Sequence, residues 1–186
     1  TIFANRLFQD GNEKASIFLK NAFGPIIGEG KKTFSKSDIP NTKATSLNIS
    51  PTVEIIEEET FSGLKNLLFI NLPPQIKKIG KNAFKDCKNL VWINLSNKIE
   101  EIEQGTFEGC HNLKYIEFPA SSLKIIKEDA FRKGTSLDQI HIPNSVTMIE
   151  KGAFNGCKNL RIVHMSASTK YSSELTFPLK AQIINQ

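Results

Sequence analysis

Three side chains capable of proton or metal chemistry recur at nearly constant spacing in this chain. Glu117, His141 and His164 are separated by 24 and 23 residues. If the chain repeats with this period, they stack in a row, near enough to share a proton or a metal ion. The simpler interpretation is that they are ordinary surface side chains, so we predict neither a metal nor a cofactor. Coupled histidines would make ligand binding change between about pH 5 and 7.

The three cysteines occupy a second recurring position. Cys87, Cys110 and Cys157 each follow a phenylalanine by three residues, and the simplest role for them is that of small buried hydrophobes. Cys87 and Cys110 would lie on adjacent turns, close enough for a disulfide, but Cys157 would then remain unpaired. No nucleophile elbow, phosphate-binding loop or HExxH motif occurs, and the recurring carboxylates lie in polar turn regions. We therefore predict that the protein is not an enzyme.

The elements that position these residues are short repeats. Phe61, Phe84, Phe107, Phe131 and Phe154 are spaced 23, 23, 24 and 23 residues apart. The same apolar template surrounds each of them; in one copy it reads Ile76, Ile79, Ala83, Phe84, Cys87, Leu90, Ile93, Leu95. A period of this length is typical of a solenoid, in which each unit buries its apolar face against its neighbours.

Each repeat contains one segment with the alternation of a half-buried strand. In the stretch from Leu90 to Leu95, Ile93 and Leu95 point inward, and a Pro or Ser ends each such strand. Elsewhere the apolar residues lie three or four apart, which indicates a turn or short helix. We therefore predict an α/β solenoid with parallel strands about 4.8 Å apart. Its sheet would form the concave face, and turns or short helices would form the convex face.

The stretch from Ile142 to Leu160 carries the pattern IP-x-x-V-x-x-I-x-x-x-AF-x-x-C-x-x-L and resembles the BspA-like class of leucine-rich repeats. The resemblance covers five units over residues 47–165. It implies a surface or secreted protein, extracellular or at the cell surface, that mediates adhesion or binds host proteins. Residues 1–46 are predicted to hold an N-terminal cap, including a short helix over 16–23, and a degenerate first repeat. Residues 166–186 are predicted to be a truncated C-terminal repeat or cap.

Composition argues against two classes of partner. The net charge is +5, but only three of the 24 basic residues are Arg, the side chain best suited to base and phosphate recognition. We predict no nucleic-acid partner. No apolar run approaches the roughly 20 residues that span a bilayer, so no membrane span is predicted in this chain.

The outward positions of the predicted strands define the candidate binding face. The first outward column contains Phe69, Trp92 and Tyr115, which would form a contiguous exposed aromatic stripe of the kind that marks interaction sites. The second column supplies the remaining candidates, Asn71, Asn94, Glu117, His141 and His164. Alternatively, the aromatic residues only stabilise the sheet, or the N-terminal segment folds over them.

Three functions fit this face. The first is a non-enzymatic module that binds a protein ligand, such as a host or extracellular-matrix protein. The second is a carbohydrate-binding module in which aromatic rings and amides hold sugar rings, and the third is an architectural spacer in a longer array. Sequons begin at Asn48 and Asn94, but a glycan there would obstruct the face, so we predict unmodified asparagines.

Overall fold

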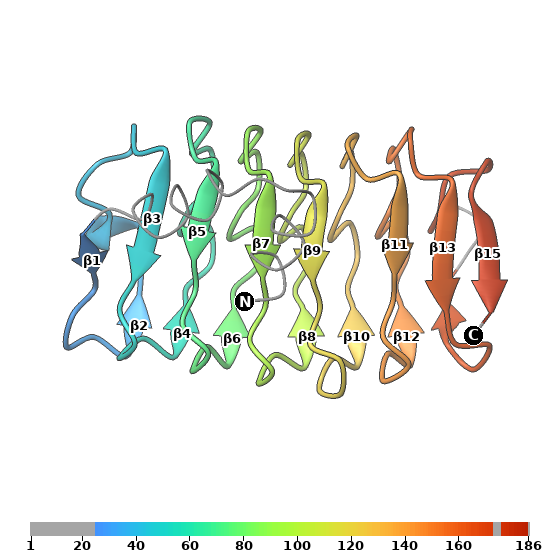
Figure 1. The fold of residues 1–186 in the computed structure, drawn as a ribbon, viewed down its shortest axis with the longest axis horizontal. Coiled ribbons are helices and arrows are strands. Elements are labelled where there is room, and N and C mark those ends of the chain that lie inside the picture. The colour runs from blue at the N-terminus through green and yellow to red at the C-terminus, as the bar shows by residue number, and fades with distance from the viewer. Residues whose placement is uncertain (1–24, 173–175, 186) are drawn as a thin grey trace, which may run out of the picture.

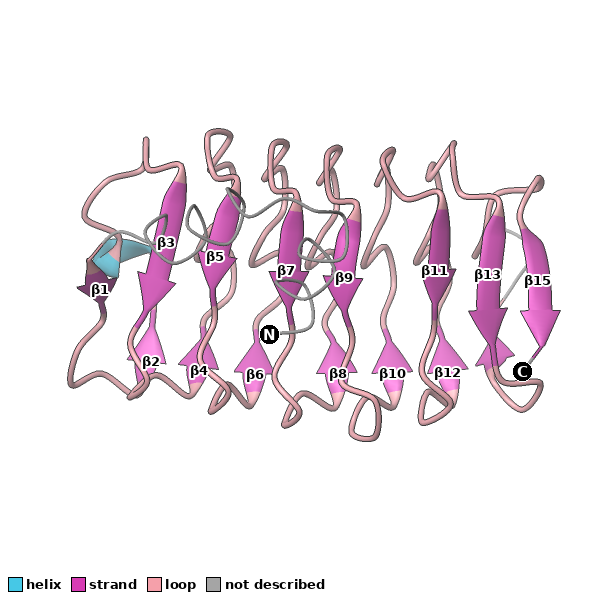
Figure 2. Cartoon of the chain, viewed as in Figure 1, coloured by secondary structure: helices cyan, strands magenta, loops and turns pink. Residues whose placement is uncertain are grey.

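The computed structural model describes residues 25–172 and 176–185, which form a two-layered β-solenoid (Figure 1, Figure 2). Each turn gives one strand to each layer. The odd-strand face contains β1 (Ile26–Ile27), β3 (Ser46–Ile49), β5 (Phe69–Asn71), β7 (Trp92–Asn94), β9 (Tyr115–Glu117), β11 (Gln139–His141), β13 (Ile162–Met165) and β15 (Gln182–Asn185). The even-strand face contains β2 (Thr33–Phe34), β4 (Ile55–Ile56), β6 (Lys78–Ile79), β8 (Glu101–Ile102), β10 (Ile125–Ile126), β12 (Met148–Ile149) and β14 (Lys170–Tyr171).

The paired strands are parallel and in repeat register, as predicted from the alternation. Leu47 pairs with Ile70, and Ile93 pairs with Ile116. The odd-strand face consists of two sheets, β1-β3-β5-β7-β9 and β11-β13-β15. The break between them follows Phe118, in the one repeat with 24 residues. The Phe118 ring meets the ring of Phe131 edge-on, with centroids 5.9 Å apart.

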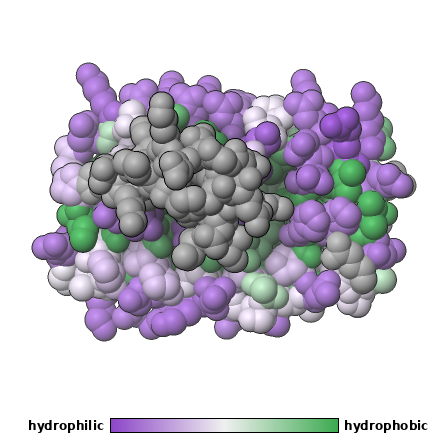
Figure 3. Space-filling view, in the orientation of Figure 1, coloured by the Kyte–Doolittle hydropathy of each residue, from purple (hydrophilic) through white to green (hydrophobic). Residues whose placement is uncertain are grey.

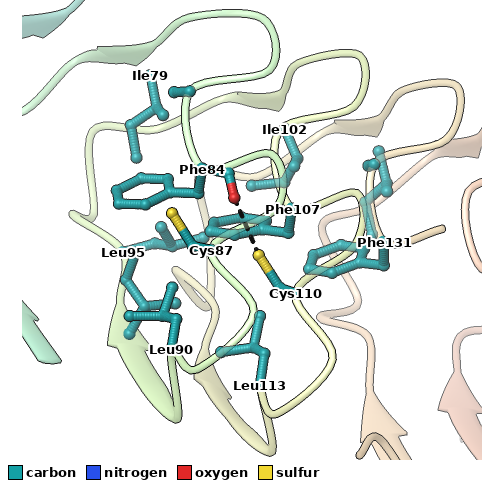
Figure 4. Close-up of a cluster of buried hydrophobic side chains, with 14 of the residues drawn as sticks. Ile79, Phe84, Cys87, Leu90, Leu95, Ile102, Phe107, Cys110, Leu113 and Phe131 are labelled. Atoms are coloured by element: carbon teal, nitrogen blue, oxygen red, sulfur yellow. Dashed lines mark hydrogen bonds between the residues drawn. The ribbon is translucent and has the colours of Figure 1, made fainter. Parts of the chain in front are cut away.

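A ladder of phenylalanines fills the space between the two faces. Neighbouring rings stack with centroid separations from 4.9 to 5.9 Å along Phe34, Phe61, Phe84, Phe107, Phe131, Phe154 and Phe177. Phe61, Phe84 and Phe107 are 0% exposed. Figure 4 shows this packing around Phe84, Phe107 and Phe131, with leucines and isoleucines from both faces. The predicted repeat and its buried phenylalanine are therefore confirmed.

Of the two alternatives predicted for the convex face, the short helices are not confirmed, and the connecting segments are turns. Among the described residues, the one helical element is the three-residue 3-10 helix η1 (Lys36–Asp38). Two positions in each of five successive turns adopt a positive φ, which interrupts a right-handed helix. The first position is occupied by Glu59, Asn82, Gly105, Asp129 and Gly152, and the second by Gly63, Asp86, Gly109, Lys133 and Gly156.

Backbone hydrogen bonds between turns give the second reason. The Phe61 amide donates to the Ala83 carbonyl at 2.8 Å, and the Phe84 amide donates to the Thr106 carbonyl at 2.9 Å. A helix would direct these amides to carbonyls four residues earlier in the same segment. Because the amides bond to the next turn instead, the connecting segments stay as stacked turns.

The last turn contains polar residues where earlier turns contain Val and Ile. Thr169 is buried, and its hydroxyl donates to the Val146 carbonyl at 2.9 Å. Phe177 continues the ring ladder on Phe154. The division of the chain at residues 46 and 166 stays a prediction, and the proposed helix over 16–23 lies outside the described residues. Within the described part, we find no helix with the length and apolar character needed to cross a bilayer.

Candidate binding face

The aromatic residues of the first column are aligned across three strands, as the repeat predicts. Phe69 pairs with Trp92, and Trp92 pairs with Tyr115. Their exposure is unequal: Tyr115 is 40% exposed, Phe69 is half-buried, and Trp92 is only 7% exposed. The prediction of a continuously exposed stripe is therefore wrong at Trp92.

The position of each strand in its sheet accounts for part of this difference. Trp92 has an aromatic neighbour on each side, and strands about 4.8 Å apart bring such side chains into contact. Tyr115 lies on β9, the last strand of its sheet, and has an aromatic neighbour on one side. The N-terminal segment, which the alternative interpretation placed over this stripe, lies outside the described residues.

The second column forms a polar ladder beside the aromatic one. Asn48 pairs with Asn71, and the Asn71 amide donates to the Asn48 side-chain oxygen at 2.8 Å. Asn94 pairs with Glu117, and both side chains are half-buried. The side-chain oxygen of Asn48 is thus engaged with Asn71, while the absence of a glycan at Asn48 and Asn94 stays a prediction.

The predicted row of Glu117, His141 and His164 is divided between two sheets. His141 pairs with His164, and their rings stack with centroids 4.2 Å apart and planes 10° apart. Glu117 belongs to β9, which has no ladder to β11 because the sheet breaks there. Among the residues that the structure describes, no group of three or more His, Cys, Asp or Glu side chains is arranged to hold a metal ion.

Gln139 lies beside these residues and was not among the predicted candidates. It is exposed on β11, and with exposed His141 it continues the accessible surface past the sheet break from Tyr115. Its repeat position placed it in the aromatic column, so the signal was present in the spacing. Gln139 was not chosen as a candidate because glutamine is a common surface residue and does not by itself indicate a binding site.

The cysteines are buried hydrophobes, as the simpler interpretation predicted. Cys87, Cys110 and Cys157 are all free thiols with 0% exposure. The Cys110 thiol donates to the Phe84 carbonyl at 3.1 Å, as Figure 4 shows, and the Cys87 thiol donates to the Phe61 carbonyl at 3.0 Å. Burial raises the pKa of Cys87 and of Cys157 to about 12. Burial also raises the pKa of Cys110 well above its usual range.

We expect these thiols to resist modification by thiol reagents in the folded protein. A rise in pKa from 9.0 to about 12 lowers the thiolate fraction at pH 8 about a thousandfold, and the thiolate is the reactive form. A colorimetric thiol reagent should modify none of the cysteines in native protein within an hour and all three after denaturation. Rapid reaction of even one thiol in native protein would contradict the buried packing.

Comparisons with known proteins agree with this fold. Stacked turns with one parallel strand on each face define a leucine-rich-repeat-like β-solenoid. The model of the BspA type leucine rich repeat region matches residues 30–161 with six copies, one more than the five repeats predicted over 47–165. The chain therefore belongs to the BspA type leucine rich repeat family. A comparison with curated proteins gave no match.

Solved structures of bacterial repeat proteins are similar to the chain. A T. pallidum leucine rich repeat protein is 30% identical with a TM-score of 0.65, over 71% of this chain and 61% of that one. A leucine rich cell surface protein from Faecalibacterium prausnitzii is 27% identical with a TM-score of 0.53, over 68% of this chain and 39% of that one.

A Bacteroides ovatus leucine-rich repeat protein shares the fold at 19% identity and a TM-score of 0.53, over 82% of this chain and 57% of that one. The chain thus matches less than two thirds of the length of each of these three proteins.

Proposed function

We propose that this chain is a non-enzymatic binding module of a surface or secreted protein, and that it holds a protein ligand on its odd-strand face. The observation that carries the proposal is the accessible surface formed by Tyr115, Gln139 and His141. This surface combines an aromatic side chain with amide and imidazole groups. Exposed tyrosines beside polar groups are frequent centres of protein interfaces.

The remaining candidates support this surface from its flanks. Trp92 pairs with Tyr115, and Phe69 pairs with Trp92 on the next strand of the same sheet. Asn71, Asn94 and Glu117 lie in the adjacent polar column. His164 backs His141 through the ring stack. Neighbours that are fixed in this way reduce the entropy lost when a partner binds.

An extracellular or surface location and a role in adhesion are part of the proposal. The relative from Faecalibacterium prausnitzii is described as a leucine rich cell surface protein. Repeat proteins of this kind present an extended face to a partner, and specificity lies in the outward residues. An extracellular-matrix or host protein is therefore the partner that we propose to test first.

The test compares two tyrosines with similar exposure on opposite faces. Tyr115→Ala changes the odd-strand face, and Tyr171→Ala changes the even-strand face, where the tyrosine is 45% exposed. We expect Tyr115→Ala to weaken binding to immobilised extracellular-matrix proteins by about tenfold or more, as interface tyrosines do. Tyr171→Ala should leave affinity unchanged. Trp92 is a poor first choice because its burial makes stability change together with binding.

Each of the other outcomes would point to a different binding surface or a different kind of partner. Equal loss in both variants would place the contact elsewhere. Competition by free oligosaccharides at millimolar concentration would favour the carbohydrate-binding alternative. If the wild-type chain binds none of the immobilised extracellular-matrix proteins, the result would contradict the proposal and favour the role of an architectural spacer.

A further inference from the structure

A basic pocket opens at the edge where the last strands of the odd-strand face begin. It is an open depression with a volume of about 540 Å³. Its lining comes from the loops that lead into β9, β11, β13 and β15, and consists of Lys114, Ser136, Asp138, Lys158, Asn159, Arg161 and Lys180. In the space-filling view, hydrophilic side chains gather along this edge of the molecule (Figure 3).

The charge of the pocket is not balanced. The lining contains four cations and one carboxylate, so its formal net charge is +3. The cations are Lys114, Lys158, Arg161 and Lys180. None of the four cations forms an ion pair with a carboxylate of the described residues. By contrast, Lys77 lies 2.6 Å from Glu54, and Lys85 lies 2.9 Å from Glu108. The carboxylate of Asp138 accepts a hydrogen bond from the backbone amide of Gln139 at 2.9 Å. The pocket therefore has an excess of positive charge that attracts anions.

The backbone that carries these cations is held by the solenoid. The Arg161 amide donates to the Asp138 carbonyl at 2.8 Å, and the Lys114 amide donates to the Val91 carbonyl at 3.1 Å. The Asn159 side chain donates to the Thr135 carbonyl at 2.7 Å. A bound ligand would therefore order side chains but not loops, which keeps the entropic cost of binding low.

The cations are spread over several turns. Lys114 and Arg161 each immediately precede an odd-numbered strand, Lys158 lies in the loop before β13, and Lys180 lies two residues before β15. At about 4.8 Å per strand, the start of β11 lies about 10 Å from the start of β15, and β9 lies beyond the sheet break from β11. One phosphate or sulfate is too small to contact all four cations. A chain with several negative groups matches this spread.

The side-chain types favour sulfate groups on a sugar chain. Lysine is a compact point charge that suits separate anionic groups, and Arg161 adds a planar fork for one of them. Ser136 and Asn159 offer hydrogen-bonding groups for sugar hydroxyls. Lys114 Nζ lies 5.3 Å from the Tyr115 ring centroid, which links the pocket to the odd-strand face.

We propose that this pocket binds a sulfated polysaccharide, in addition to any protein ligand held at Tyr115. Clusters of basic residues are typical of heparin-binding surfaces as well as nucleic-acid surfaces. The cluster here is confined to one end of the solenoid and contains one arginine, whereas a duplex presents a long, continuous row of phosphates.

The experiment measures heparin binding by surface plasmon resonance at physiological salt. The pocket variant combines Lys158→Ala, Arg161→Ala and Lys180→Ala, which are all exposed side chains. The control variant removes the same charge from exposed lysines elsewhere, through Lys78→Ala, Lys81→Ala and Lys151→Ala. We expect the pocket variant to bind heparin at least about tenfold more weakly and the control to change less than about threefold. Circular dichroism confirms that both variants are folded.

Four further arms complete the test. Desulfated heparin should bind far more weakly than heparin, and raising the salt concentration should weaken wild-type binding more steeply than binding by the pocket variant. Equal loss in the pocket and control variants would overturn the proposal, because the charge effect would then be general. If duplex DNA binds as tightly as heparin, and the pocket variant weakens both to the same extent, the pocket would be assigned to nucleic acid instead. Displacement of heparin by millimolar inorganic sulfate would reduce the site to one for a small anion.

Discussion

Replacing Phe107 with alanine should lower the free energy of unfolding by about 3–5 kcal/mol. The Phe107 ring is 0% exposed and stacks between Phe84, at 5.4 Å, and Phe131, at 5.3 Å. Truncation removes both stacking contacts and leaves a cavity that the strands on either side cannot close, because ladder hydrogen bonds fix their spacing. Urea denaturation followed by circular dichroism measures this loss.

The matched control is Phe177→Ala at the end of the same ladder. Phe177 is 8% exposed and has one stacked neighbour, Phe154. In a solenoid each repeat interacts with its nearest neighbours, so a defect in the terminal turn uncouples that turn alone. We expect a clearly smaller loss for Phe177→Ala than for Phe107→Ala. Equal losses, or a loss below about 1 kcal/mol at Phe107, would contradict the expected contribution of the stacked Phe107 ring to stability.

Replacing Gly80 with alanine should also destabilise the fold strongly, by about 1–3 kcal/mol or more. Gly80 is buried and follows β6. A Cβ at this position would lie 2.5 Å from the Glu58 amide nitrogen and 2.7 Å from the Glu57 carbonyl carbon. These atoms belong to the backbone of the preceding turn and cannot rotate away. Accommodating the methyl group therefore requires that two turns move apart.

Gly134→Ala is the comparison for this substitution. Gly134 is also buried, and a Cβ there would lie 3.1 Å from the Phe131 carbonyl oxygen and 3.3 Å from the Leu137 side chain. It occupies the repeat position at which three other turns carry cysteine. We expect thermal unfolding to show a much smaller change for Gly134→Ala than for Gly80→Ala. If the two variants melt together, the close approach at Gly80 has no energetic consequence.

Much of the fold was predictable because the repeat imposes one solution on every unit. The 23–24-residue spacing of phenylalanines such as Phe61 and Phe84 predicted the stacked core, and the alternation through Ile93 and Leu95 predicted the parallel strands. Local hydrophobic periodicity is sufficient for such predictions since each contact is made with an equivalent residue one period away. The helix prediction failed because spacings of three or four residues fit stacked turns as well as helices.

The candidate face was predictable only as a set of aligned columns. Repeat arithmetic placed Phe69, Trp92 and Tyr115 in one column, and the strand register confirms this alignment. It could not give exposure, since Trp92 is buried while Tyr115, in the same column, is exposed. Exposure depends on which neighbours each strand has, and the sheet ends after β9.

The sequence by itself determined the family, the repeat register and the inward-facing positions of each repeat, because these follow from a pattern that recurs every turn. Only the tertiary structure decided which outward side chains meet. It kept His141 stacked on His164, as the repeat predicts, but placed Glu117 on a separate sheet. It also gathered Lys114 and Lys180, which are far apart in the chain, into one pocket. The physical reason is that contacts across a sheet break, or between loops at its edge, depend on how the turns stack and not on the repeat alone.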